Sequence, residues 1–159
     1  MADNSAMVNG AFTMKRPTWQ LQWDEGMSVG IPEIDEDHKQ FLLLINELNR
    51  SITEGRKQTE IKERLKFIVD DAARHFQREE KFFHEMQFPD AASHALVHGQ
   101  VLKALRRIQD SFIPYGLDAE WVDAGLFIKS ILLSHIFTED MKYAVYFKAQ
   151  TGNFDGGEG

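Results

Sequence analysis

The chain has 159 residues, the length of a single domain that can bury one sizeable hydrophobic core. Its net charge of −7 disfavours nucleic acid and anionic membrane surfaces as partners. It contains no cysteine, which excludes disulfides, thiolate zinc sites and cysteine-bound iron–sulfur clusters.

The two ends of the chain differ in composition from the middle. Residues 1–18 are polar, small and aperiodic, and we expect them to form a flexible N-terminal arm. Residues 151–159 are glycine-rich and acidic, and we expect a flexible tail there. Residues 19–150 are therefore expected to hold the folded domain.

Two segments in the first half of that domain have helical periodicity, with apolar residues three and four positions apart. The first series consists of Ile34, His38, Phe41, Ile45, Leu48 and Ile52. The second consists of Ile61, Leu65, Ile68, Ala72, His75, Glu79, Phe82 and Met86. Gly55 is expected to end the first helix, and the second should end before Pro89.

Two more segments of the same kind follow. The third series consists of Ala91, His94, His98, Val101, Leu105, Ile108 and Phe112, before a turn at Pro114-Tyr115-Gly116. The fourth begins near Asp118, a candidate N-cap, and contains Trp121, Ala124, Ile128, Ile131 and His135. Four such helices joined by short loops predict an all-α domain, an antiparallel up-down-up-down four-helix bundle with an N-terminal arm.

Polar residues occupy core-facing positions on all four predicted helices. They are His38, His75, Glu79, His94, His98 and His135. A lone buried histidine is more often a hydrogen-bonded core residue than a metal ligand. Six such groups in one core are costly unless something satisfies them together, and metal ions do so. Imidazole and carboxylate ligands suit iron, zinc, manganese and cobalt. The sixth histidine, His84, lies off this face, and we assign it no role.

Asp140 is a further candidate ligand, but its spacing is irregular. It follows His135 by five residues, so on a regular α-helix the two side chains would point about 140° apart around the helix axis. A π-bulge would bring the two side chains together, and such bulges are frequent at functional sites. We therefore predict a local irregularity between His135 and Asp140.

The arrangement of these residues resembles the hemerythrin family, specifically its prokaryotic single-domain members. The resemblance extends from about Trp19 to Phe147. Its motifs are Trp23-Asp24, Val29 to Asp35, His38-Lys39, His75-Phe76, Glu79-Glu80, Phe88-Pro89, His94, His98, Leu132 to Ile136, and Asp140.

The resemblance implies a non-haem di-iron site (Fe2+/Fe3+) with a bridging oxo or hydroxo group. One iron would be bound by His94, His98 and His135, and the other by His38 and His75. Glu79 and Asp140 would bridge them. Together with the bridging oxygen, these ligands fill all but one of the twelve octahedral positions of two ions, and the vacancy falls on the iron with two histidines. A small ligand such as O2 can enter there.

We expect an apolar O2 pocket around this vacancy. Its expected lining is Phe76, Leu132, Ile136 and Ile34. Such a pocket without substrate-orienting polar groups favours reversible binding over turnover, so no catalytic residue is expected. The expected function is reversible binding of O2 for transport, storage, delivery or sensing.

Two other function classes remain open. The first is a di-iron oxidoreductase acting on peroxide or NO, and the second is metal storage. Ferritin-like oxidases carry Glu-x-x-His motifs, and this sequence contains none. No secretory signal is visible, and the most apolar stretch, residues 126–137, is short and interrupted by Lys129 and His135. We therefore expect a cytoplasmic protein without a membrane partner, and the sequence predicts no particular protein partner.

Overall fold

A computed structural model describes residues 19–111 and 118–152, with the side chains of residues 118–120 left out. The expected arm at 1–18, most of the tail, Phe112, the Pro114–Gly116 turn and the capping side chain of Asp118 lie outside these described residues. The elements in chain order are η1 (Glu25–Met27), α1 (Pro32–Thr53), α2 (Gln58–Glu85), α3 (Ala91–Ser111), α4 (Asp118–His135), η2 (Ile136–Asp140) and α5 (Met141–Gly152).

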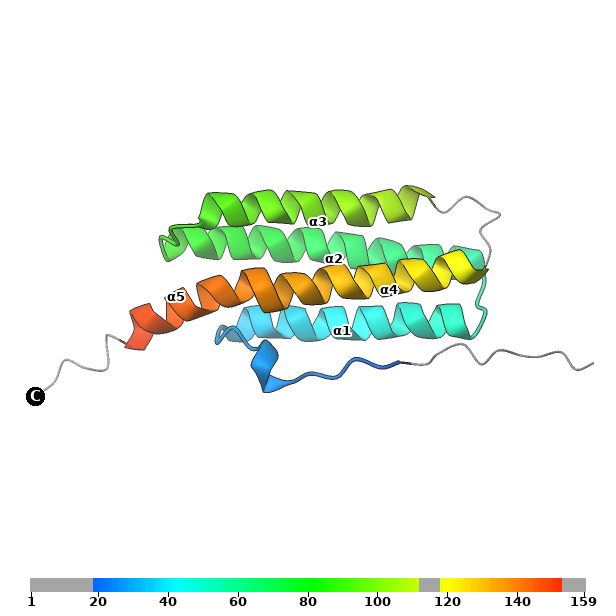
Figure 1. Cartoon of the computed structure of the whole chain (residues 1–159), viewed down its shortest axis with the longest axis horizontal. Coiled ribbons are helices and arrows are strands. Elements are labelled where there is room, and N and C mark those ends of the chain that lie inside the picture. The colour runs from blue at the N-terminus through cyan, green and yellow to red at the C-terminus, as the bar shows by residue number, and fades with distance from the viewer. Residues whose placement is uncertain (1–18, 112–117, 153–159) are drawn as a thin grey trace, which may run out of the picture.

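The described residues form a four-helix bundle, which confirms the predicted fold class (Figure 1). Helix α1 packs against α2 and α4, and α3 also packs against α2 and α4. Consecutive helices run in opposite directions because the connections between them are short. Helices α4, η2 and α5 together make the fourth column of the bundle.

Local sequence explains where the first helices begin and end. Pro32 occupies the first turn of α1, where its missing N–H costs nothing. Asp35 lies in the first turn of α1, and its carboxylate accepts hydrogen bonds from two residues that precede the helix. The donors are the Val29 amide (2.8 Å) and the Ser28 hydroxyl (2.6 Å), and these bonds fix the chain at the start of α1. Gly55 follows α1 with a φ of +65°, which glycine adopts at little cost. As expected, α1 ends before Gly55 and α2 ends before Pro89.

The core-facing series are largely buried as predicted, and all six members of the first series are buried. The second series departs at its end, where Phe82 and Met86 are only half-buried and Phe83 is 1% exposed instead. The reason is an aromatic contact: the Phe83 ring packs on Tyr143, with centroids 4.8 Å apart. The prediction for Phe82 was therefore wrong by one position.

The fourth column is helical from Asp118 to Gly152, so it includes the first two residues of the expected tail, and its segment Trp121–Gly152 has 32 residues. Of the described helices, it alone is long and apolar enough to cross a membrane by length and composition. The core helix of a soluble bundle passes the same test. Here the helix packs against α1 and α3 and carries the buried polar residues His135 and Asp140.

The core consists of layers of different composition along the bundle. Near the α1–α2 turn it is mainly aliphatic, with Ile45, Leu48, Ile52, Ile61, Leu65, Ile68 and Leu105. Near the α2–α3 turn it is largely aromatic, and Phe83, Phe88 and Tyr143 pack there with Ile34. The buried histidines and acids lie between these two layers, where each helix contributes one or two of them.

Candidate metal centre

The structure brings all seven candidate residues together inside the bundle. His38 comes from α1, His75 and Glu79 from α2, His94 and His98 from α3, His135 from the end of α4, and Asp140 from the end of η2. Their side chains are 0–4% exposed. His84 is exposed on the surface of α2, as its position off the core face predicted.

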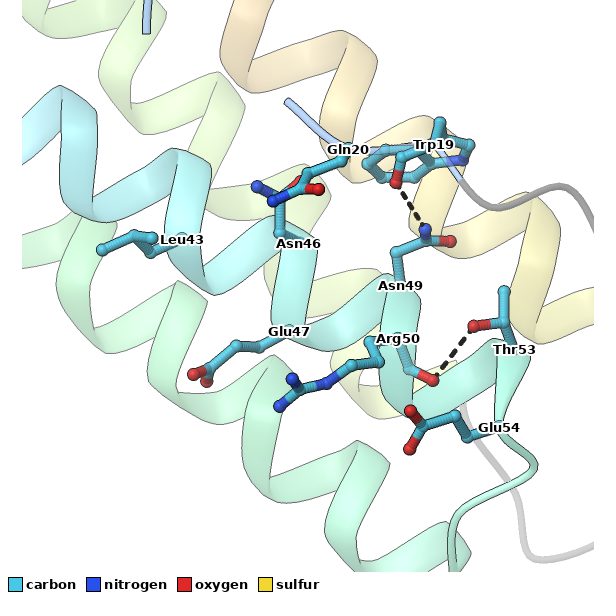
Figure 2. Close-up of a pocket in the computed structure, with 9 residues that line it drawn as sticks. All are labelled: Trp19, Gln20, Leu43, Asn46, Glu47, Asn49, Arg50, Thr53 and Glu54. Carbon is cyan, nitrogen blue, oxygen red and sulfur yellow. Dashed lines mark hydrogen bonds between the residues drawn. The ribbon is translucent and has the colours of Figure 1, made fainter. Parts of the chain in front are cut away.

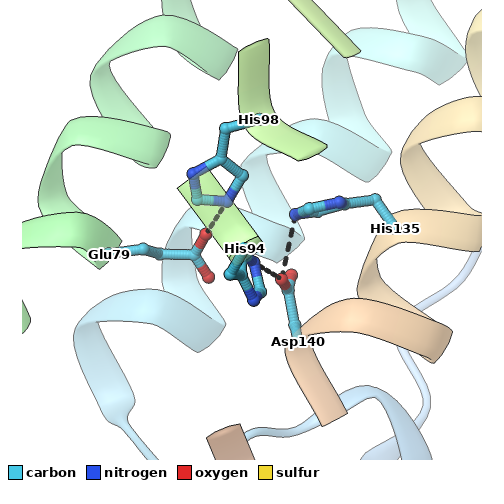
Figure 3. Close-up of side chains that lie close together, drawn as sticks. All are labelled: Glu79, His94, His98, His135 and Asp140. Carbon is cyan, nitrogen blue, oxygen red and sulfur yellow. Dashed lines mark ion pairs between the residues drawn. The ribbon is translucent and has the colours of Figure 1, made fainter. Parts of the chain in front are cut away.

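The segment between His135 and Asp140 is a π-helix, η2, which confirms the predicted irregularity. In a π-turn the hydrogen bonds span five residues instead of four, so residues five apart come to lie on the same side. Consequently the Nε2 atom of His135 lies 3.0 Å from a carboxylate oxygen of Asp140. Both side chains point into the bundle (Figure 3).

Each of the two carboxylates lies close to histidine rings from several helices. The Nε2 atoms of His38 and His94 each lie 3.1 Å from a carboxylate oxygen of Asp140, in addition to that of His135. Glu79 has the Nε2 atoms of His98 at 3.0 Å and His75 at 3.3 Å on one oxygen.

These contacts divide the seven residues into two groups. In each group, one ligand atom per residue lies within 4.8 Å of all the others. The first group is Glu79, His94, His98, His135 and Asp140, and the second is His38, His75, Glu79 and Asp140. Both acids belong to both groups. The geometry therefore suits two adjacent ions with two shared carboxylates.

Many buried polar atoms of the cluster make no hydrogen bond. Within the described residues, the buried side-chain nitrogen and oxygen atoms without a hydrogen-bond partner all belong to these seven residues. They include every Nε2 atom of the five histidines, one oxygen of Glu79 and both oxygens of Asp140. Leaving one buried polar group unsatisfied costs about 1–3 kcal/mol, so this many in one place calls for a ligand. The residues thus fit a metal centre that would satisfy the inward-facing atoms together.

The outward nitrogens of two histidines are occupied by carboxylates. Nδ1 of His75 donates to Asp37 (3.1 Å), which in turn pairs with Arg78. Nδ1 of His98 donates to Glu80 (2.9 Å). Partners of this kind fix the ring so that Nε2 faces a metal. Burial alone would raise the pKa of Asp37. The contacts with His75 and Arg78 lower it by more, so this pKa lies below its usual range.

The charge states of two buried groups follow from the same contacts. Burial raises the pKa of Asp140, but the close rings of His135, His38 and His94 outweigh it and hold this pKa well below its usual range. Burial and the neighbouring Glu79 carboxylate raise the pKa of Tyr143 well above its usual range. The Tyr143 hydroxyl therefore keeps its proton and donates it in a hydrogen bond to the second oxygen of Glu79.

The four residues expected to line an O2 pocket are all buried, but they fall into three separate core clusters. Phe76 and Leu132 belong to the aliphatic cluster, Ile34 to the aromatic one, and Ile136 to a third cluster with Met27 and Leu42. Phe76 contacts the ligand rings directly, since its ring stacks on His98 with centroids 4.0 Å apart. The role of these residues in a pocket stays a prediction.

Sequence reasoning missed several residues around the cluster. Phe41 was expected only as a core residue, yet its ring lies 5.0 Å from that of His75 and 6.5 Å from that of His38. Its position three residues after His38 could have indicated this contact. Asp37 and Glu80 are each next to a ligand in sequence, but their partners His75 and His98 lie on other helices, 38 and 18 positions away, so spacing along one helix does not indicate these contacts. The same holds for Tyr143, whose partner is 64 positions away.

Comparison with known proteins agrees with this geometry. A family model described as "Hemerythrin HHE cation binding domain" matches residues 29–146. The chain belongs to the hemerythrin family. This confirms the resemblance seen in the sequence, and the match spans from the entry of α1 into α5. The domain is thus of a metal-binding type, in keeping with the cluster described above.

The hemerythrin relatives come from distant organisms. A "Hemerythrin-like protein" of Naegleria gruberi is 36% identical over 127 residues, which cover 77% of this chain and 90% of the relative. A "Bacteriohemerythrin" of Stenotrophomonas maltophilia is 27% identical over 134 residues, 84% of this chain and 86% of the relative. A "Myohemerythrin" of Sipunculus nudus is 26% identical over 121 residues, 76% and 88% of the two chains. The shared length is in each case nearly a whole relative.

Proposed function

We propose that this hemerythrin-family chain holds two iron ions and binds O2 reversibly, as a cytoplasmic protein for oxygen transport, storage, delivery or sensing. The observation that carries the proposal is the set of unpartnered, inward-facing ring nitrogens and carboxylate oxygens on seven buried residues. No internal hydrogen bond satisfies these atoms, whereas a pair of cations would satisfy them together.

The two groups of ligand atoms support an unequal division of the ligands. His94, His98 and His135 would hold one iron, His38 and His75 the other, and Glu79 and Asp140 would bridge them. The second iron would then have one coordination position fewer filled by protein. When bound, two ferrous ions supply two electrons and a vacant position, which is the chemistry that O2 binding needs.

The surroundings of the cluster favour binding over turnover. Phe41 and Phe76 cover ligand rings with apolar surface and keep water away from them. The Tyr143 hydroxyl is buried and hydrogen-bonded to Glu79, so it orients that carboxylate. A site of this kind can bind and release a small neutral molecule without transferring groups to a second substrate.

The proposal is tested by adding O2 to the reduced, iron-loaded protein and recording the visible spectrum. We expect a stable charge-transfer band that fades under argon and returns with O2. Steady consumption of added peroxide or NO would instead support the oxidoreductase alternative, and iron uptake without any O2-dependent band would support metal storage.

Two single-residue variants make the test specific to this site. His38→Ala removes a ligand from the iron with the vacancy and should abolish the band. His84→Ala removes an exposed histidine of the same helix bundle and should leave the band unchanged. Equal loss in both variants would contradict the ligand assignment.

A further inference from the structure

The buried position of the cluster raises the question of how a metal ion reaches it. The seven residues are 0–4% exposed. Aromatic rings cover several of them: Phe41 lies on His75, Phe76 on His98, and Phe83 on His94. A hydrated cation needs a polar path past this cover, because shedding its water into an apolar layer is costly.

One surface groove reaches the cluster. It lies between α3 and α4, has a volume of about 430 Å³, and includes His135 in its lining. His135 is 4% exposed, and its Nε2 lies 3.0 Å from the Asp140 carboxylate, whereas neither ring nitrogen makes a hydrogen bond. A buried imidazole that lines a groove and faces a carboxylate can accept a cation that enters there.

The rest of this groove has the polar lining that a hydrated cation requires. Beside its apolar members, it is lined by Gln100, Ser130, Ser134, Thr138 and Glu139. Their oxygens can replace water around a divalent ion for a short time. Glu139 adds a carboxylate that is 22% exposed and pairs with Nζ of the exposed Lys142 at 2.9 Å, so an entering cation exchanges with this ammonium at the carboxylate.

The groove also adjoins the irregular turn of the fourth column. Thr138 and Glu139 belong to the π-helix η2, whose last residue is Asp140. Glu139 therefore directly precedes Asp140, a shared carboxylate of the cluster, in the chain. The hydrogen bonds of a π-turn are also less regular than those of an α-helix, which lowers the cost of a local opening.

A second groove serves as a contrast. It has a volume of about 630 Å³ and runs along the outer face of α1, where Asn49 holds the backbone of Trp19 and where Leu43, Glu47 and Glu54 also line it (Figure 2). None of the seven clustered residues lines it. This groove therefore has acidic residues in its lining, as the α3–α4 groove does, but none of the seven clustered residues.

We propose that the α3–α4 groove is the entry port through which metal ions load the buried centre, with Glu139 as the first contact and His135 as the receiving ligand. This inference rests on the proposed metal pair, and adds to it a route and two residues with separate roles in uptake. Glu139 attracts and briefly holds the hydrated cation, and His135 takes it from there into the cluster.

The test is the rate at which the metal-free protein takes up Co2+, followed by the visible absorption of the bound ion after rapid mixing. Glu139→Gln should slow uptake about fivefold at low salt, because one attracting charge is lost at the mouth. Ser130→Trp places a bulky side chain in the groove from an exposed position and should slow uptake on the order of tenfold, since entry then awaits an opening motion. Both variants should reach the wild-type end point of two ions per chain.

The matched controls lie in the α1 groove. Glu54→Gln removes a carboxylate and Leu43→Trp fills the hollow, and neither should change the uptake rate. Wild-type rates in both Glu139→Gln and Ser130→Trp would overturn the port, even with two ions bound at the end. An end point below two ions in the wild-type protein would instead overturn the metal pair itself, and the port with it. Helical circular dichroism equal to that of the wild type verifies that each variant is folded.

Discussion

Two regions of the bundle core, the end near the α1–α2 turn and the middle, are filled by side chains of different chemistry. Toward the α1–α2 turn, mainly aliphatic side chains fill the space, and no described buried side-chain nitrogen or oxygen there lacks a hydrogen-bond partner. In the middle, the histidines and acids occupy equivalent core-facing positions but leave their inward atoms without partners. The aliphatic end is complete by itself, whereas the cluster is complete only with a ligand. We therefore expect the first to maintain the fold and the second to respond to metal.

The largest expected effect is that of metal on stability. Since the unfolded chain does not hold the cluster together, bound metal should raise the free energy of unfolding by about 4 kcal/mol at a free concentration 1,000-fold above Kd. Thermal unfolding with and without Co2+ measures this rise. Glu79→Ala removes a ligand shared by both groups and should eliminate most of it. An equal rise in Glu79→Ala and wild type would mean that metal acts elsewhere.

A cavity in the aliphatic end should show the reverse behaviour. Leu65 is 1% exposed, and Leu65→Ala should lower the free energy of unfolding by about 3 kcal/mol with and without metal. Two ions should still bind, because no ligand is touched. Denaturant titration combined with metal analysis checks both expectations. Loss of metal in a folded Leu65→Ala protein would show that the two regions are more tightly coupled than their packing indicates.

A smaller effect is expected where the aromatic layer meets the cluster. Tyr143→Phe keeps the packed ring but removes the hydroxyl that donates to Glu79. We expect a loss of about 1–2 kcal/mol in the free energy of unfolding and about tenfold weaker metal binding, with two ions still bound at saturation. Competition with a chelator measures the affinity. Unchanged affinity would show that Glu79 keeps its orientation without this hydrogen bond.

The same contrast explains how far the sequence could predict the structure. The aliphatic positions follow a simple three-and-four spacing, so Ile45, Leu48 and their neighbours could be assigned to the core from the pattern alone. The irregular spacing of His135 and Asp140 likewise predicted the π-turn. Phe83 and Tyr143 were less accessible to such reasoning, because their burial depends on contacts between helices distant in sequence. The Asp37–Arg78 pair joins α1 to α2, and spacing along a single helix does not predict it.

The most direct test of the account is the number of iron ions bound per chain after anaerobic loading and removal of loosely held metal. We predict two ions in the wild-type protein, two in His84→Ala, and no more than one in His38→Ala. Fewer than two ions in the wild type, or two in a protein that lacks both Glu79 and Asp140, would contradict the claim that these buried side chains hold a metal pair.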